Sequence, residues 1–326
     1  MAEVGETAWP GRMRRRFLLA AAVVLLAAAA LSRPAGAEVL YDQSDSTDPL
    51  LVDANDFPAA FDSLDDRAAD DFTVPLGERW TIGQIDLIGS GGSAGDLMNI
   101  SIVRDLNGQP NTGGLGTVFA PPLGYVPTAG GPGDYTLYLG SPPAISPGHY
   151  WLVLQHVDPS LLEWSWQARS VQAGSPAAWE NPGAGPGNCP NWSVRTTCPG
   201  GSGGPDQLFK LSGNREIIPN EFSLGAVTHR PSGSASIAGT FPGKGVAVVT
   251  DARRAAPGRP LRIKRRRVPI AAAGVTSLPV LPTRSTGKKL RAGKPVSVAV
   301  RVSFTPDQGL PRARSVTLKL RRKPVA

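Results

Sequence analysis

Ten aspartates between Asp42 and Asp71 are the first side chains in the sequence whose types suggest chemistry. Carboxylate oxygens are the hard ligands that Ca²⁺ prefers, and the ion takes about six to eight of them. Asp70 and Asp71 are the candidate ligands, so calcium is the one cofactor that the sequence suggests. The spacing matches no calcium-binding loop, and a solvated acidic rim is the alternative interpretation.

Cys189 and Cys198 are the two cysteines of the chain. An even number of cysteines in an exported chain favours a disulfide, and the first residues of this chain predict export. A metal or thiol site is the other interpretation. The chain has no C-x-x-C pattern and no histidine near the two cysteines to support that alternative.

Tryptophans provide candidates for stacking on sugar rings. Trp164 and Trp166 alternate with polar residues in a predicted strand, and large aromatic side chains at such positions usually point into the core. Trp179 and Trp192 lie in a segment rich in Gly and Pro, between residues 173 and 206. These two are therefore the candidate ligand-binding aromatics.

A basic run gives the third candidate site. Arg262, Lys264, Arg265, Arg266 and Arg267 form a cluster of the kind that binds polyanions. Predicted export argues against nucleic acid and favours a cell-wall polymer, an acidic lipid or a glycan as the partner. A solvated loop with no ligand is the alternative.

The sequence does not point to catalysis. Gly91–Gly95 and Gly200–Gly204 match G-x-S-x-G, but a nucleophile elbow needs a strand before it and a helix after it, and polar loop sequence surrounds both matches. His149, His156 and His229 are scattered, and the first two lie on or beside a predicted strand. The sequence therefore predicts a protein that is not an enzyme.

Residues 1–37 have the order of a secretory signal peptide. Arg14–Arg16 precede an apolar run from Phe17 to Leu31, and Ala35–Ala37 forms an A-x-A cleavage site. A membrane span needs about 20 apolar residues, so an uncleaved anchor is the weaker interpretation. No second run of spanning length follows, and we expect no membrane span once the signal is removed.

The charge distribution divides the remaining chain into two parts. Residues 38–214 contain 6 Lys and Arg against 20 Asp and Glu, whereas residues 215–326 contain 23 against 4. Such asymmetry indicates two modules with different surfaces.

Short apolar runs with a period of two, separated by Gly, Pro and Asp, predict strands in both parts. Trp80–Leu87 and Tyr135–Leu139 show the alternation, Gly148–Gln155 is continuous like a central strand, and Val296–Phe304 alternates without a break. The predicted fold class is all-β. We expect an acidic antiparallel sandwich over 38–212, a linker over 213–221 and a basic sandwich over 222–326.

Five segments in the first part resemble a known domain. Ala69–Pro75, Trp80–Ile82, Arg104–Pro110, Pro147–Leu152 and Trp164–Trp166 follow the order of the jelly-roll-like β-sandwich of many secreted bacterial surface proteins. The hallmarks of that domain are an ADDF-x-V-P strand and a PG-x-YW strand. The resemblance covers about residues 38–212 and implies an extracellular setting, without catalytic residues to transfer.

The second part resembles the immunoglobulin-like module found at the C-terminus of secreted actinobacterial proteins. Phe222–Val227, Pro242–Gly245 and the final Val316–Lys323 carry the likeness. Together the two resemblances imply a structural or adhesive protein of the cell exterior, secreted or held at the cell surface. A secreted carbohydrate-binding module is the main alternative, and a hydrolase with an unrecognised acid pair is a weaker one.

The signal peptide leads to a direct prediction. We expect the exported protein to begin at Glu38, because the A-x-A site ends at Ala37. N-terminal sequencing of protein recovered from the culture medium or the cell surface tests this. An N-terminus that still contains Arg15 or Phe17 would contradict it.

Overall fold

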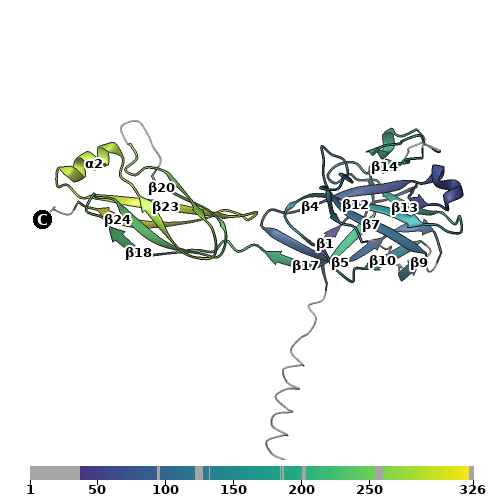
Figure 1. Ribbon diagram of the computed structural model, residues 1–326, viewed down its shortest axis with the longest axis horizontal. Coiled ribbons are helices and arrows are strands. Elements are labelled where there is room, and N and C mark those ends of the chain that lie inside the picture. The colour runs from purple at the N-terminus through teal and green to yellow at the C-terminus, as the bar shows by residue number, and fades with distance from the viewer. Residues whose placement is uncertain are drawn as a thin grey trace, which may run out of the picture. The chain divides into compact units, whose positions relative to one another are not determined.

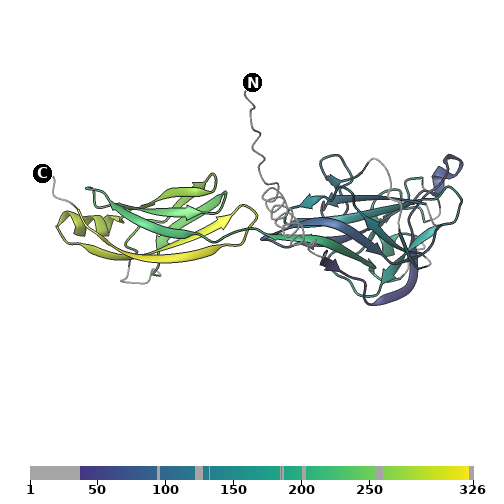
Figure 2. The ribbon, with the colours of Figure 1, turned by 90° about the horizontal axis from the view of Figure 1, so that it is seen from below.

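The computed structural model describes residues 37–322, apart from 94–95, 122–127, 132, 184, 186, 200–202 and 254–259. Within these residues the chain forms two β-sandwiches, the 3₁₀ turns η1 (Ala59–Leu64) and η2 (Arg195–Thr197), and the helix α2 (Arg284–Arg291). Figures 1 and 2 show the strand layers of each sandwich. The all-β prediction is confirmed. The predicted signal peptide lies outside the described residues, except for Ala37.

The first sandwich consists of three sheets, whose strands are given in order of pairing. The first sheet contains β1 (Glu38–Asp42), β17 (Phe209–Ile217), β5 (Glu78–Leu87), β10 (Asp134–Tyr138) and β9 (Thr128–Gly131), with β11 (Ala144–Ile145) also on β5. The second contains β15 (Ser193–Val194), β14 (Ala178–Glu180), β4 (Arg67–Val74), β12 (Gly148–Val157), β7 (Leu97–Arg104) and β8 (Thr117–Phe119). The third contains β16 (Asp206–Gln207), β13 (Trp164–Arg169) and β2 (Thr47–Asp53), with β6 (Gly89–Gly91) on β13. The short β3 (Asn55–Asp56) pairs with β12 in parallel, and the other described pairs are antiparallel.

The core of this sandwich is filled by the inward face of each sheet. Trp164 and Trp166 are fully buried, as their alternation predicted. Their ring nitrogens donate to backbone carbonyls, Trp164 to Gly133 at 2.9 Å and Trp166 to Leu208 at 2.7 Å. Buried indoles need such partners, so these two rings serve the core and not a ligand.

The outer face of the second sheet is apolar as well, and a cover of loops and short strands lies over it. Trp151 and Val153 alternate with core residues along β12, so they point outward, yet both are buried. The described parts of residues 170–206 form the cover, which includes β14 (labelled in Figure 1) and places Trp192 on the apolar face. The predicted disulfide between Cys189 and Cys198 is confirmed and closes a loop within this segment.

The second sandwich consists of a sheet of three strands and a sheet of four. The smaller sheet contains β18 (Ser223–His229), β19 (Ala235–Phe241) and β22 (Gly274–Val280). The larger contains β21 (Arg266–Ile270), β20 (Gly245–Asp251), β23 (Val296–Pro306) and β24 (Arg312–Leu320). Along β23 the buried side chains of Val298, Val300, Val302 and Phe304 alternate with more exposed ones, as predicted.

The sequence did not predict α2, which connects β22 to β23. The Thr283 hydroxyl caps its first turn by accepting a hydrogen bond from the Thr286 amide. Thr286 and Leu290 are buried, whereas Arg284, Lys288 and Arg291 are exposed. Two buried positions with Gly287 between them are too short a pattern to distinguish this helix from a loop in the sequence.

The linker predicted over 213–221 begins too early, because β17 continues to Ile217 opposite Glu78 of β5. The register shifts at Gly213, where a Cβ atom would lie 2.0 Å from the carbonyl oxygen of Thr81. Gly213, the first residue of the predicted linker, therefore permits a bulge within the strand.

Removal of the disulfide is expected to destabilise the first sandwich. A Cys189→Ser/Cys198→Ser variant should lose roughly 2–3 kcal/mol, the chain-entropy value for a loop of about ten residues. All tryptophans beyond Ala37 lie before residue 200, so tryptophan fluorescence during urea unfolding follows this sandwich alone. An unchanged fluorescence midpoint would contradict the prediction.

Candidate functional site

The structure places the residues singled out in the sequence in separate parts of the two sandwiches. Asp70 and Asp71 lie on β4, Trp179 lies on β14, and Trp192 directly precedes β15. The basic run lies in the second sandwich, in the segment that leads into β21 and in the first two residues of that strand.

Asp70 ties three segments of the first sandwich together. It is fully buried, and its Oδ2 accepts hydrogen bonds from Gln43 Nε2 and from the Gln207 amide, each at 2.6 Å. Its Oδ1 accepts from the Asp71 amide at 2.8 Å. Burial, followed by the neighbouring Asp206 carboxylate, raises the pKa of Asp70 well above its ordinary value. This carboxyl group has the surroundings of a structural residue.

Asp71 has different partners, because adjacent strand residues point to opposite faces. Its Oδ2 contacts His149 Nε2 and accepts from the Ser175 amide at 2.7 Å. His149 Nδ1 lies 3.5 Å from Asp105 Oδ1, so the imidazole sits between two carboxylates. Burial of Asp71 raises its pKa. Asp70 and Asp71 therefore do not form one ligand set. No group of three or more His, Cys, Asp or Glu within the described ranges could hold a metal ion, and calcium binding stays a prediction.

Trp179 and Trp192, which the sequence grouped together, have separate surroundings. Trp192 packs on the apolar outer face of β12, with the Arg67 guanidinium 5.7 Å from its ring centre. Its Nε1 donates to Thr112 Oγ1 at 3.3 Å. Trp179 instead forms one wall of a cavity of about 230 Å³, which we call the Trp179 pocket. The residues lining this pocket are Asp53, Asn55, Phe57, Leu64, Asp66, Glu163, Trp179 and Asn181.

Asp66 is the most perturbed acid of the Trp179 pocket. Its Oδ1 accepts from the Asn55 amide at 2.6 Å. Burial raises the pKa of Asp66 to about 8, although the hydrogen bond from Asn55 lowers it. The negative charges of Asp53 and Glu163 raise the pKa as well. The carboxyl group is therefore mostly uncharged at neutral pH, beside two further carboxyl groups.

The sequence gave no sign of this pocket as a unit. Asp66 counted only as one member of the acidic rim, and Glu163 and Asn55 were not singled out. The lining comes from β2, β3, η1, β14 and the loop before β13, and only tertiary packing brings these segments together.

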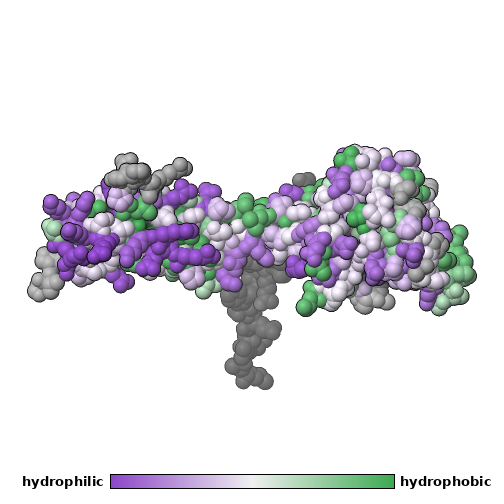
Figure 3. Space-filling model, turned by 90° about the horizontal axis from the view of Figure 1, so that it is seen from above, coloured by the Kyte–Doolittle hydropathy of each residue, from purple (hydrophilic) through white to green (hydrophobic). Residues whose placement is uncertain are grey.

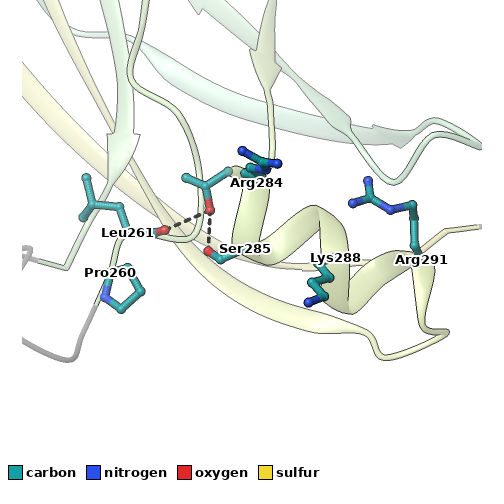
Figure 4. A pocket seen from close by; sticks show the side chains of 7 residues that line it. Pro260, Leu261, Arg284, Ser285, Lys288 and Arg291 are labelled. Carbon is teal, nitrogen blue, oxygen red and sulfur yellow. Dashed lines mark hydrogen bonds between the residues drawn. The ribbon is translucent and has the colours of Figure 1, made fainter.

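A second surface lies on α2 of the other sandwich. A groove of about 890 Å³ is lined by Pro260, Leu261, Thr283, Arg284, Ser285, Lys288 and Arg291. Figure 4 shows the three cationic side chains spaced along the helix, with Pro260 and Leu261 near its Ser285 end. Thr283 Oγ1 donates to the Leu261 carbonyl at 3.0 Å, which fixes the start of α2 to that loop.

The predicted basic run is joined to this helix. The Thr283 amide donates to the Arg262 carbonyl at 3.0 Å, and the Lys264 amide donates to the Leu281 carbonyl at 2.8 Å. The Arg262 side chain already has a partner within the chain, because its guanidinium contacts the Ser297 carbonyl oxygen. The Arg262 backbone amide donates a hydrogen bond to Asp251 Oδ2 at 2.7 Å.

The remaining cations of this surface point to solvent. Lys264, Arg265, Arg266 and Arg267 are exposed, and within the described part of the chain neither they nor the cations of α2 form an ion pair. Figure 3 shows strongly hydrophilic side chains gathered on the visible face of the second sandwich. We call Lys264–Arg267 together with Arg284, Lys288 and Arg291 the basic surface.

Comparison with known proteins does not identify the chain. No family model and no curated protein matches it. One solved structure found in the comparison is a calcium-binding mutant of β-glucuronidase 2 from Bacteroides uniformis, at 12% identity and a TM-score of 0.15. The match covers 83% of this chain and 28% of that one, and a TM-score this low supports no inference about fold or function.

None of the helices in the described residues is long and apolar enough to cross a bilayer.

The raised pKa of Asp66 predicts a pH-dependent difference in stability. The unfolded chain loses this proton near its ordinary pKa of 3.8 and the folded chain near 8, so the Asp66 contribution to stability falls as the pH rises between those values. Asp66→Asn keeps the hydrogen-bond acceptor and removes the titration. From about pH 5 to about pH 9, the fluorescence midpoint in urea should therefore fall more for the wild type than for the variant. Parallel pH curves would contradict this.

Proposed function

We propose that the protein is a non-enzymatic adhesive protein of the cell exterior, secreted or held at the cell surface, and that its basic surface binds an anionic polymer of the cell wall. The observation that carries the proposal is the continuity of the basic surface. Backbone hydrogen bonds tie Arg262 and Lys264 to Thr283 and Leu281, directly before α2. Lys264–Arg267 and α2 present cations without acidic partners among the described residues.

The local structure supports a binding role for α2. Residues spaced by four and seven positions lie on one side of a helix, which places Arg284, Lys288 and Arg291 together, opposite the buried Thr286 and Leu290. Three like charges on two turns repel one another, and this cost is relieved when a polyanion approaches.

An additional role for part of the basic surface follows from its position in the sheet. Arg266 and Arg267 lie on β21, an edge strand, and charged edge residues prevent pairing with strands of other molecules. Protection of this edge requires charges on β21 alone, so it does not explain the cations of α2.

The setting of the proposal comes from the sequence. The signal-like N-terminus and the resemblances to secreted bacterial surface domains support export, and export favours wall polymers over nucleic acid as the polyanion. The disulfide of the first sandwich fits an oxidising compartment.

A carbohydrate-binding module is the second candidate function, and the Trp179 pocket favours it. An aromatic ring beside carboxyl and amide groups is a typical sugar-binding composition. A hydrolase is less well supported, although a neutral acid beside a carboxylate also occurs in glycosidases. The volume of about 230 Å³ is below the roughly 300–1,000 Å³ of pockets for drug-sized ligands, and cleavage requires room for a sugar on each side of the bond.

The proposal is tested with three triple variants of the mature chain on a phosphocellulose column eluted with NaCl. Arg265, Arg266 and Arg267 are replaced by Ser in the first variant, and Arg284, Lys288 and Arg291 in the second. The control replaces Lys244, Arg312 and Arg314, which already pair with Asp307 or Glu221. All three lose the same charge.

We expect the first two variants to elute at clearly lower salt than the wild type, because exposed charges without partners contribute most to polyanion binding. The control should elute close to the wild type. If all three variants elute together, net charge alone governs retention and the basic surface is not a binding site.

A further inference from the structure

We propose that the Trp179 pocket binds an amino sugar, a pyranose ring that carries a free ammonium group. The inference deepens the carbohydrate-binding candidate and rests on it, and it is independent of the basic surface. Its grounds are the walls of the pocket, the charge of its lining and one buried hydrogen-bond donor without a partner.

The walls suit a carbon ring. Trp179 Nε1 donates to the Asp53 carbonyl at 2.9 Å, which fixes the indole against β2. Phe57 and Leu64 add apolar surface to the lining. Gly187 also approaches the indole so closely that a Cβ atom there would lie 2.9 Å from the ring, so the ring has little room to move toward Gly187. A fixed aromatic face is what a pyranose stacks on, and it does not coordinate a bare ion.

The carboxyl groups that line the pocket favour a cationic ligand. Asp53, Asp66 and Glu163 contribute three carboxyl groups, and the described residues that line the pocket include no Lys, Arg or His. The raised pKa of Asp66 reflects its burial and the two neighbouring negative charges. An ammonium group in the pocket would neutralise part of this charge and would also interact favourably with the indole face.

A buried hydrogen-bond donor of Asn55 is a separate observation that points to a ligand. The residue is fully buried, and its Oδ1 accepts from the Trp164 amide at 2.8 Å and lies 3.3 Å from His156 Nδ1. These contacts fix the orientation of the side-chain amide. Its Nδ2 has no hydrogen-bond partner among the described residues, although Asn55 lines the pocket. A ring hydroxyl would accept this hydrogen bond and remove the cost of the unpaired donor.

The cover segment gives the pocket a fixed shape. Asn181, which follows β14, donates through Nδ2 to the Leu64 carbonyl at 3.2 Å. Its backbone amide donates to the Cys189 carbonyl at 2.7 Å, so the disulfide loop supports the same wall. A pocket shaped before binding loses less entropy when a small ligand enters.

The test compares glucosamine, N-acetylglucosamine and glucose on the mature chain, by saturation-transfer NMR and by calorimetric titration. The three sugars share the ring and differ in the substituent at one position, which carries a positive charge in glucosamine alone. We expect glucosamine to bind at least about tenfold more tightly than N-acetylglucosamine, since acetylation removes the cation. Equal binding of the two would overturn the amino-sugar inference and leave carbohydrate binding in place. Absence of binding by all three would overturn both.

Two pairs of variants locate the site. Trp179→Ala and Glu163→Gln should each weaken glucosamine binding by at least about tenfold. Tyr138→Ala and Glu216→Gln, an exposed aromatic and an exposed acid outside the pocket, should leave it unchanged. Trp179→Phe retains an aromatic face and should keep part of the affinity, which separates loss of the ring from loss of the fold. Unaltered binding by Trp179→Ala would overturn the inference.

Discussion

The first sandwich depends on covering a sheet that is apolar on both faces. Ala69, Val103, Trp151 and Val153 form an outer apolar surface besides the main core, and exposing it to water would be unfavourable. The described parts of residues 170–206 provide the cover, and the disulfide closes the loop between Cys189 and Cys198 within it. The same cover carries Trp179 against the segment around Asn55, so the pocket is a consequence of how this face is buried.

The two sandwiches use their charged residues in opposite ways. In the first, several acids are buried among hydrogen-bond donors and have raised pKa values, as for Asp70 and Asp66. Their role is to connect segments or to line a cavity. In the second, many cations lie on exposed strand and helix positions around an apolar core. The charge asymmetry of the sequence thus reflects two different structural roles.

Several local features could be predicted because they depend on neighbours along the chain. The alternation in β23 and the pairing of Cys189 with Cys198 are examples, since strand period and loop length are local properties. Asp70 and Asp71 have different hydrogen-bond partners for a local reason as well, since neighbouring residues in a strand point to opposite faces. The bulge at Gly213 and the short helix α2 were missed because one glycine, or one buried turn, is compatible with several structures.

The sequence by itself determined that both halves are β-structure, that acids gather in one and cations in the other, and that two cysteines stand close enough to pair. Only the tertiary structure decided which side chains meet. It separated Trp179 from Trp192, brought Asp66 and Glu163 together, and joined Arg262 to the start of α2. The physical reason is that strand period is set by adjacent residues, whereas a cavity forms where sheets and loops distant in sequence pack against one another.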